Sequence, residues 1–183
     1  MSTALAAAVV ATTVRLMASH AYADGPPPGF SGGFDEGSCH ACHFDKEPNA
    51  AGGRLTIEGV PTKFAAGERY TVTITLTRTG MKRGGFELAV RFKDTRAQAG
   101  TLAPGPGEKD RVGLRSDSGV EYAGQIKAGS IVEAGDSVKW TVEWTAPSRG
   151  GPVIFHVAAN AADGNESADG DFVYTANAES TPP

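Results

Sequence analysis

Residues 138–144 read VKWTVEW, in which Val138, Trp140, Val142 and Trp144 alternate with polar neighbours. Successive side chains of a β-strand point to opposite faces, so this period of two predicts a strand with one dry face. Both tryptophans of the chain lie on that face. A buried face of this size needs a second layer to pack against, which makes the stretch the natural centre of a β-sheet core.

Two more runs alternate in the same way, YTVTITL at 70–76 and FELAVRF at 86–92. At roughly 1.5–3 kcal/mol for each buried apolar side chain, the three runs are enough to hold a domain without a metal or a disulfide. Further strands are expected at 54–58, 152–158 and 171–175, with weaker ones at 100–102, 111–114 and 120–123.

Turn signals rich in glycine and proline separate these runs. Roughly seven to nine short amphipathic strands predict an all-β, antiparallel sandwich of two sheets. We expect this domain to span residues 53–176 and to be followed by a polar tail at 177–183. The 183 residues, 40% hydrophobic and 21% charged, suit one globular domain.

The N-terminus has the pattern of an export signal at residues 1–23. An apolar run from Ala4 to Val14 precedes the A-x-A sequence Ala21-Tyr22-Ala23. Cleavage after Ala23 would give a periplasmic or secreted chain. No Lys or Arg precedes the run and Arg15 interrupts it, so whether Met1 is the true start stays open.

The net charge and the hydropathy of the chain exclude some classes of binding partner. The formal net charge of −4 argues against nucleic acid and anionic membranes, which recruit clustered Lys and Arg. The apolar run in the leader is too short to cross a bilayer, and no second hydrophobic stretch follows, so no membrane span is expected in the mature chain.

Residues 39–43 read CHACH and contain C-x-x-C-H, the attachment motif of c-type haem. Thiols three positions apart reach the two vinyl groups along one porphyrin edge, and the next histidine lies under the ring, where it ligates iron. The sequence predicts one covalent haem c, with Cys39 and Cys42 as thioether donors and His43 as axial ligand. The surrounding segment 24–52 is rich in Pro and Gly and is expected to be extended and poorly packed.

Other interpretations of the motif stay open. Cys39 and Cys42, the only cysteines, could form a short-loop disulfide or an active redox pair. With His40 or His43, and with His156 to complete the set, they could bind zinc. A chance match is the remaining possibility. The chain cannot be a cytochrome c fold, because no helical pattern surrounds the motif.

A haem iron held by His43 needs a sixth ligand or an open face. His156 is one candidate and Met81 the other, since a thioether ligand would raise the reduction potential. A structural role is the alternative for each. His40 lies inside the attachment loop and is not expected to reach the opposite face. The acidic loop 163–171 (DGNESADGD) fails the EF-hand pattern and is expected to be a solvated turn.

Several short motifs occur in a fixed order over residues 30–176: SGGF, CHACH, GVPTKFAAGERYTVTITL, GGFELAV, WTVEWTAPSRGGPVIFHVAANAADGN and GDFVYT. Together they resemble the reeler-like domain, in particular bacterial exported proteins called choice-of-anchor V domains. The resemblance implies an immunoglobulin-like sandwich at the cell surface or in the periplasm. It does not imply an enzyme activity. Members often carry a histidine near the place where this chain has Gln125.

No catalytic motif emerges, so we expect no enzyme. The expected function is that of an exported monohaem c-type protein in one-electron transfer or haem-based sensing, with an unknown redox or surface partner. Reeler-related domains beside electron-transfer modules in some eukaryotic reductases support this by analogy alone. The alternative is an extracytoplasmic binding or adhesion module whose Cys39–Cys42 pair is a structural disulfide.

Overall fold

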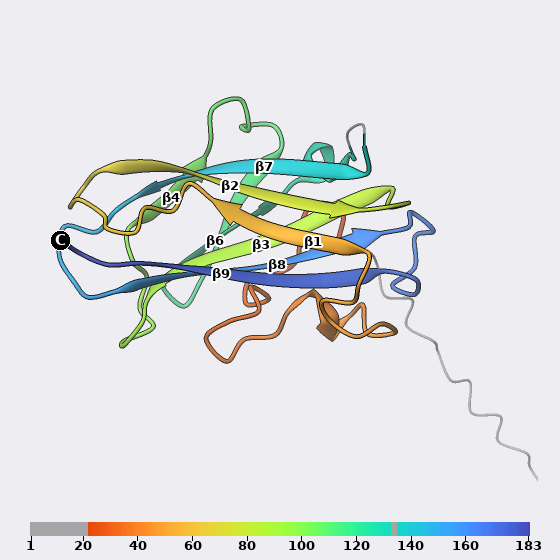
Figure 1. Cartoon of the computed structure of the whole chain (residues 1–183), viewed down its shortest axis with the longest axis horizontal. Helices are drawn as coiled ribbons and strands as arrows, with labels where there is room; N and C mark the ends of the chain where they lie inside the picture. The colour runs from red at the N-terminus through yellow and green to blue at the C-terminus, as the bar shows by residue number, and fades with distance from the viewer. Residues whose placement is uncertain (1–21, 133–134) are drawn as a thin grey trace, which may run out of the picture.

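The computed structural model describes residues 22–132 and 135–183 (Figure 1). Of the expected export signal, only Tyr22 and Ala23 are among them. The described residues form an all-β fold with two short 3₁₀ turns, Cys39–Ala41 and Lys127–Ser130. The strands are β1 Gly53–Glu58, β2 Arg69–Arg78, β3 Arg83–Phe92, β4 Thr101–Pro104, β5 Val112–Asp117, β6 Val120–Gln125, β7 Ser137–Thr145, β8 Val153–Ala162 and β9 Phe172–Ser180.

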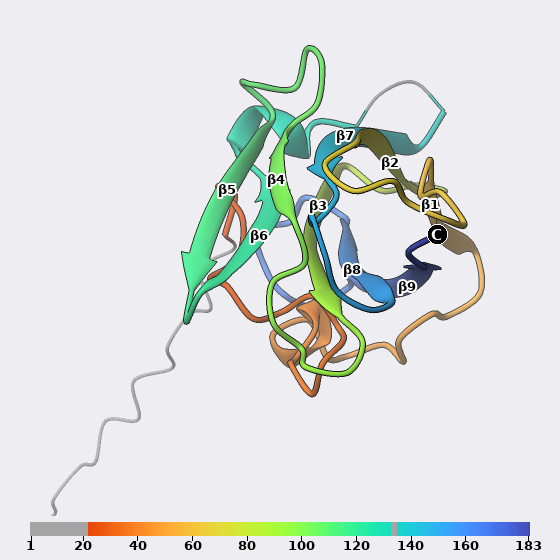
Figure 2. The same cartoon turned by 90° about the vertical axis from the view of Figure 1, so that its left-hand side faces the viewer.

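Two antiparallel sheets pack face to face, which confirms the predicted sandwich. One has the order β1-β2-β7-β4 and the other β5-β6-β3-β8-β9. Figure 2 shows the two layers nearly end-on. The register places Ile74 of β2 opposite Trp140 of β7, and Leu88 of β3 opposite Val157 of β8. Every expected strand is present, including the three weaker ones.

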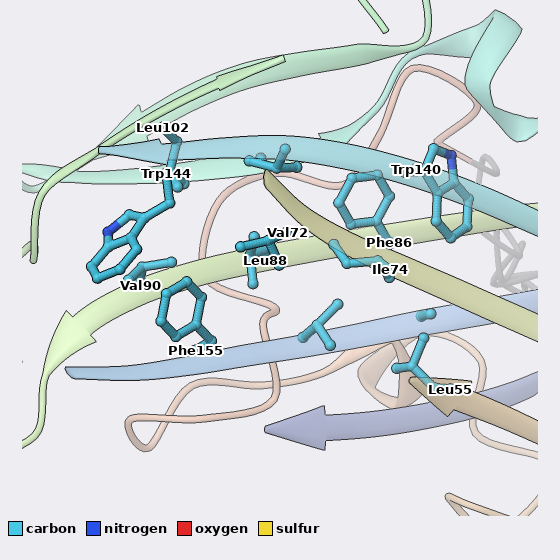
Figure 3. Packing of buried hydrophobic residues seen from close by; sticks show 14 of the residues in the cluster. Leu55, Val72, Ile74, Phe86, Leu88, Val90, Leu102, Trp140, Trp144 and Phe155 are labelled. Atoms are coloured by element: carbon cyan, nitrogen blue, oxygen red, sulfur yellow. The ribbon is translucent and has the colours of Figure 1, made fainter. Parts of the chain in front are cut away.

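The run at 138–144 forms β7 and lies at the centre of the core. Its apolar face is fully buried, and Trp140 packs against Phe86 with ring centroids 4.5 Å apart. Trp144 meets Phe155 edge-on at 4.9 Å (Figure 3). Both indole N–H groups donate to backbone carbonyls, that of Trp140 to Gly129 at 2.7 Å and that of Trp144 to Ala99 at 2.8 Å. The core therefore buries no unpaired indole group.

Several strands run past their expected ends, and the longest extensions are those of β8 and β9. β8 continues to Ala162 and β9 to Ser180, because the two pair with each other from Val153–Ser180 to Ala161–Phe172. Residues 177–180 thus belong to the sheet, and Ser180 is fully buried. The extra length of β8 carries Asn160 to the edge of the candidate site.

The outer face of β3 is also buried, which alternation alone does not indicate. Glu87, Ala89 and Arg91 alternate with the core residues, yet they are at most 8% exposed. The N-terminal segment 24–52, red to orange in Figures 1 and 2, lies against this face of the five-stranded sheet. Residues 25–40 thus form a partial third layer, which the expectation of a poorly packed lead-in did not include, whereas residues 44–52 are mostly exposed.

Among the described residues, no helix has the length and apolar character needed to cross a bilayer.

Candidate haem-attachment site

The CHACH motif forms a tight helical turn. Ser38 is extended and caps the turn by accepting the N–H of His40 at 3.2 Å. The carbonyl of Cys39 accepts two backbone N–H groups, from Cys42 at 3.2 Å and from His43 at 3.0 Å. Both cysteines are free thiols, with Cys39 partly buried and Cys42 exposed. This local folding keeps the two thiols and the following imidazole on one short, stiff element.

A buried glutamate anchors the segment just before the motif. Glu87, on the outer face of β3, accepts the backbone N–H of Gly29 at 3.0 Å and that of Phe30 at 2.5 Å. Burial raises the pKa of Glu87 to about 7, against the lowering effect of those two N–H donors and of Arg115. The carboxylate therefore pins the chain that leads into the turn.

Two further contacts hold the segment on either side of the turn. Glu36 accepts hydrogen bonds from Arg91 and, at 2.5 Å, from the hydroxyl of Tyr122. Farther along, the side chain of Asn49 exchanges hydrogen bonds with the amide and hydroxyl of Thr175 on β9, at 2.9 and 3.1 Å. The motif is thus held between anchors from β3, β6 and β9.

One cavity of about 650 Å³ receives all three residues of the motif that are expected to hold haem. Its volume lies within the roughly 300–1,000 Å³ typical of small-molecule sites. Cys39, Cys42 and His43 contribute to its lining, together with apolar side chains of the N-terminal segment and two cations. These further lining residues include Pro26, Pro27, Phe30, Arg83, Lys127, Asn160 and Asp171.

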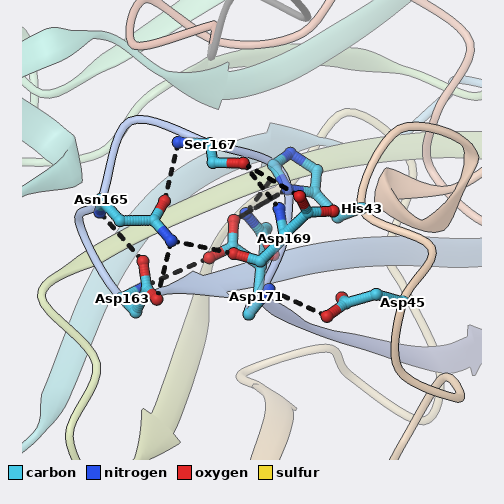
Figure 4. Close-up of polar contacts among 9 residues, drawn as sticks. His43, Asp45, Asp163, Asn165, Ser167, Asp169 and Asp171 are labelled. Atoms are coloured by element: carbon cyan, nitrogen blue, oxygen red, sulfur yellow. Dashed lines mark hydrogen bonds and ion pairs between the residues drawn. The ribbon is translucent and has the colours of Figure 1, made fainter.

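The His43 ring is held by a buried carboxylate (Figure 4). Its Nδ1 lies 2.8 Å from Oδ2 of Asp171, which is only 1% exposed. Asn160 Nδ2 donates to the same oxygen at 2.9 Å, and the backbone N–H of Asp163 donates to the other oxygen at 3.1 Å. The imidazole therefore has a fixed position at the edge of the cavity.

The electrostatics of Cys39 bear on the redox interpretation. Burial raises the pKa of the Cys39 thiol to about 12, and the nearby Glu87 adds to the rise. The thiolate is the nucleophile in thiol–disulfide exchange, and redox-active cysteines have lowered pKa values. The pKa of Cys39 is shifted in the opposite direction, so this thiol lacks the lowered pKa that is typical of the attacking cysteine of a redox pair.

The residues of the site fit a haem c. Two thiols and an imidazole face one cavity, apolar Pro and Phe side chains border it, and its volume suits a cofactor. Zinc fits less well, because the residues at 22–132 and 135–183 bring no three His, Cys, Asp or Glu side chains together as a metal site. His156, which the zinc interpretation needs, does not line the cavity.

The two candidates for a sixth ligand lie elsewhere. Met81 is 3% exposed and belongs to the hydrophobic core between the sheets. His156, on β8, meets Phe34 edge-on at 4.8 Å, and a Cβ on Gly33 would come within 2.1 Å of its Cγ. The segment therefore covers His156 directly. His40 bonds the carbonyl of Lys46 at 3.1 Å and does not line the cavity, as its place in the loop indicated.

Three residues of the site escaped prediction, namely Glu87, Asn160 and Asp171. The acidic loop is solvated at Asp163 and Asp169, as expected, but Asp171 is buried. The one signal available was its position directly before the apolar strand at 172–175, where a side chain is fixed by the sheet. Glu87 sits on an alternating strand, so its pattern predicted solvent on that face.

No family model and no curated protein matches the chain. Among solved structures, the reeler domain of human F-spondin is 17% identical with a TM-score of 0.50, over 75% of this chain and 93% of that one. The Reelin-N domain of F-spondin is 18% identical with a TM-score of 0.52, over 79% of this chain and 95% of that one. Likeness at this identity concerns the fold alone. The chain has a reeler-like β-sandwich fold.

Proposed function

We propose that this protein is an exported β-sandwich module that carries one covalent haem c and acts in one-electron transfer or haem-based sensing. The observation that carries the proposal is the shared cavity. Cys39, Cys42 and His43 all line one space of about 650 Å³, although a chance C-x-x-C-H need not border any cavity. A bound haem c would supply an iron centre that gains or loses one electron.

Each thiol has a defined part in attachment. If haem is attached, the sulfur of each cysteine would bond to one carbon of a vinyl group, and the thiol hydrogen would go to the other carbon. Both additions would conserve all atoms and need no oxidant. The helical turn keeps both thiols on one side of the chain, and the anchors at Glu87 and Glu36 hold that turn against the sheet.

Other residues position the group and shield it. His43 presents its imidazole at the cavity wall, and Pro26, Pro27 and Phe30 reduce access of water. Arg83 and Lys127 are exposed at the same cavity, and neither forms an ion pair with another described residue. They are the cations available for the two carboxylates that a haem carries.

The absorption spectrum and the mass of the chain test whether haem is attached. The full chain is expressed for export with a haem-maturation system, and the pyridine haemochrome spectrum is recorded. We expect a c-type band and the mass of one haem, both lost in the double variant Cys39→Ala/Cys42→Ala. The matched control is His40→Ala, which alters the other motif histidine and should keep the band. A chain without the band, two hydrogens lighter than its reduced form, would refute attachment.

The second candidate is an extracytoplasmic binding or adhesion module whose cysteines form a disulfide. The reeler-like fold favours it, and the comparisons support this candidate more directly, because they bear on the fold and carry no information on haem. The core also lies apart from the cysteines, so the sandwich needs no cofactor. The two-hydrogen mass loss in the experiment above is its expected signature.

A further inference from the structure

We propose that Asp171 is a positioning residue that fixes the tautomer of His43 and thereby makes Nε2 the iron donor. The inference rests on the proposed function for its consequence at iron, although the tautomer itself is a property of the chain alone. It assigns a role in the site to a buried carboxylate that also accepts hydrogen bonds from Asn160 and from the backbone of Asp163.

The geometry around His43 determines which of its two ring nitrogens carries the proton. A carboxylate accepts hydrogen bonds, and Asp171 Oδ2 lies 2.8 Å from Nδ1, so Nδ1 is the donor. A neutral imidazole has one N–H, which leaves Nε2 with a free lone pair. The amide of Asn160 has two N–H groups. One donates to Asp171 at 2.9 Å, and the amide Nδ2 lies farther from the ring, at 3.3 Å from Nδ1 and 3.5 Å from Nε2. The carboxylate therefore makes the shorter and stronger contact to His43.

The acceptor is held rigidly by the sheet. Asp171 directly precedes β9, where Phe172 pairs with Ala161 and Val173 pairs with Asn160 of β8. The carboxylate and Asn160 are therefore held by two paired strands, independently of the N-terminal segment. A second contact joins that segment to the loop, because Asp45 accepts the backbone N–H of Gly170 at 2.9 Å. That contact also lowers the pKa of Asp45.

The pairing has a consequence for the iron. A carboxylate on the far nitrogen makes a histidine a more basic ligand. A more basic ligand stabilises the more highly charged ferric state, so the His43–Asp171 pair would lower the reduction potential of a bound haem. Asp171 thus would tune the potential without touching the metal.

Replacing Asp171 by Asn tests this, with Asp169→Asn as the matched control. Both changes remove one carboxylate from the same loop, and Asp169 has no hydrogen bond to His43. In the haem-loaded chain, Asp171→Asn should raise the reduction potential and lower the iron–histidine stretching frequency in resonance Raman spectra. Asp169→Asn should leave both at the wild-type values, and Asp171→Glu should recover part of the shift.

A measurement without haem separates the two proposals. In chain produced without the maturation system, ¹⁵N shifts of the His43 ring at alkaline pH should show the proton on Nδ1, and Asp171→Asn should move part of it to Nε2. A wild-type proton on Nε2 would overturn the inference. So would equal potentials in Asp171→Asn and Asp169→Asn. A wild-type chain without haem but with the Nδ1 tautomer would remove the proposed function and leave Asp171 as the orienting residue. If Asp171→Asn does not fold, the tautomer of the wild-type chain and the reduction potential of Asp171→Glu test the inference.

Discussion

Replacing Glu87 by Gln is expected to flatten the pH dependence of stability in the range from about pH 5 to about pH 7. Glu87 is 1% exposed, and burial raises its pKa from 4.5 to about 7. The amide of the variant keeps an oxygen for the N–H groups of Gly29 and Phe30 but does not titrate. The variant thus removes the charge and preserves the anchor.

The direction of this pH dependence follows from the pH at which Glu87 loses its proton in the unfolded and in the folded chain. The unfolded chain releases the Glu87 proton near 4.5, whereas the folded chain keeps it up to about 7. Unfolding between these values releases a proton, so the contribution of Glu87 to stability is fully present below 4.5 and is lost as the pH rises through about 7. The gap in pKa corresponds to at most about 3.5 kcal/mol of unfolding free energy, at about 1.4 kcal/mol for each pKa unit.

Urea unfolding followed by the fluorescence of the buried tryptophans measures this contribution at a series of pH values. The control is Glu58→Gln, an exposed glutamate on β1. His156 titrates with the opposite sign, and its effect cancels in the difference between wild type and Glu87→Gln. The reasoning is refuted if the free energy of unfolding falls with pH equally in wild type, Glu87→Gln and Glu58→Gln.

Three further substitutions probe the core and the covered face. Met81→Leu conserves volume and should cost less than about 1.5 kcal/mol of stability without changing the spectrum of the haem-loaded chain; a spectral shift would show that Met81 is a ligand. Trp140→Ala removes an indole that packs on Phe86 and should cost about 3–5 kcal/mol in urea unfolding, where a loss below about 1 kcal/mol would contradict its central place. Burial, and then Arg91, lower the pKa of His156 below 6.5. The thermal stability of wild type relative to His156→Asn should therefore fall as the pH is lowered from 6.5, because Glu87 contributes equally to both chains; a difference that stays constant with pH would contradict the cause.

The strands and their dry faces were predictable from the sequence because alternation is a local property. Val138, Trp140, Val142 and Trp144 show in their own order which side chains share a face, and the structure buries all four. Even short strands such as β4 were found from their flanking turns. The ends were less predictable, because β9 reaches Ser180 by pairing with β8, which its own residues do not specify.

The candidate site was predictable only in part. C-x-x-C-H is a pattern of neighbouring residues, so Cys39, Cys42 and His43 stood out without a structure. Asp171 and Asn160 did not, because they are far from His43 along the chain and meet it only after β8 and β9 pair. Met81 and His156 had suitable chemistry, but burial in the core and cover by the N-terminal segment keep both out of the cavity.

The sequence by itself therefore determined the β-sandwich and the attachment motif, since both are encoded in short-range patterns of apolar and reactive residues. Only the tertiary structure decided that the N-terminal segment packs on the outer face of β3, that Glu87 and Arg91 are buried there, and that His43 meets Asp171. The physical reason is that these contacts join segments distant in sequence. Whether a polar side chain on a strand faces water or another layer depends on what the rest of the chain brings against it.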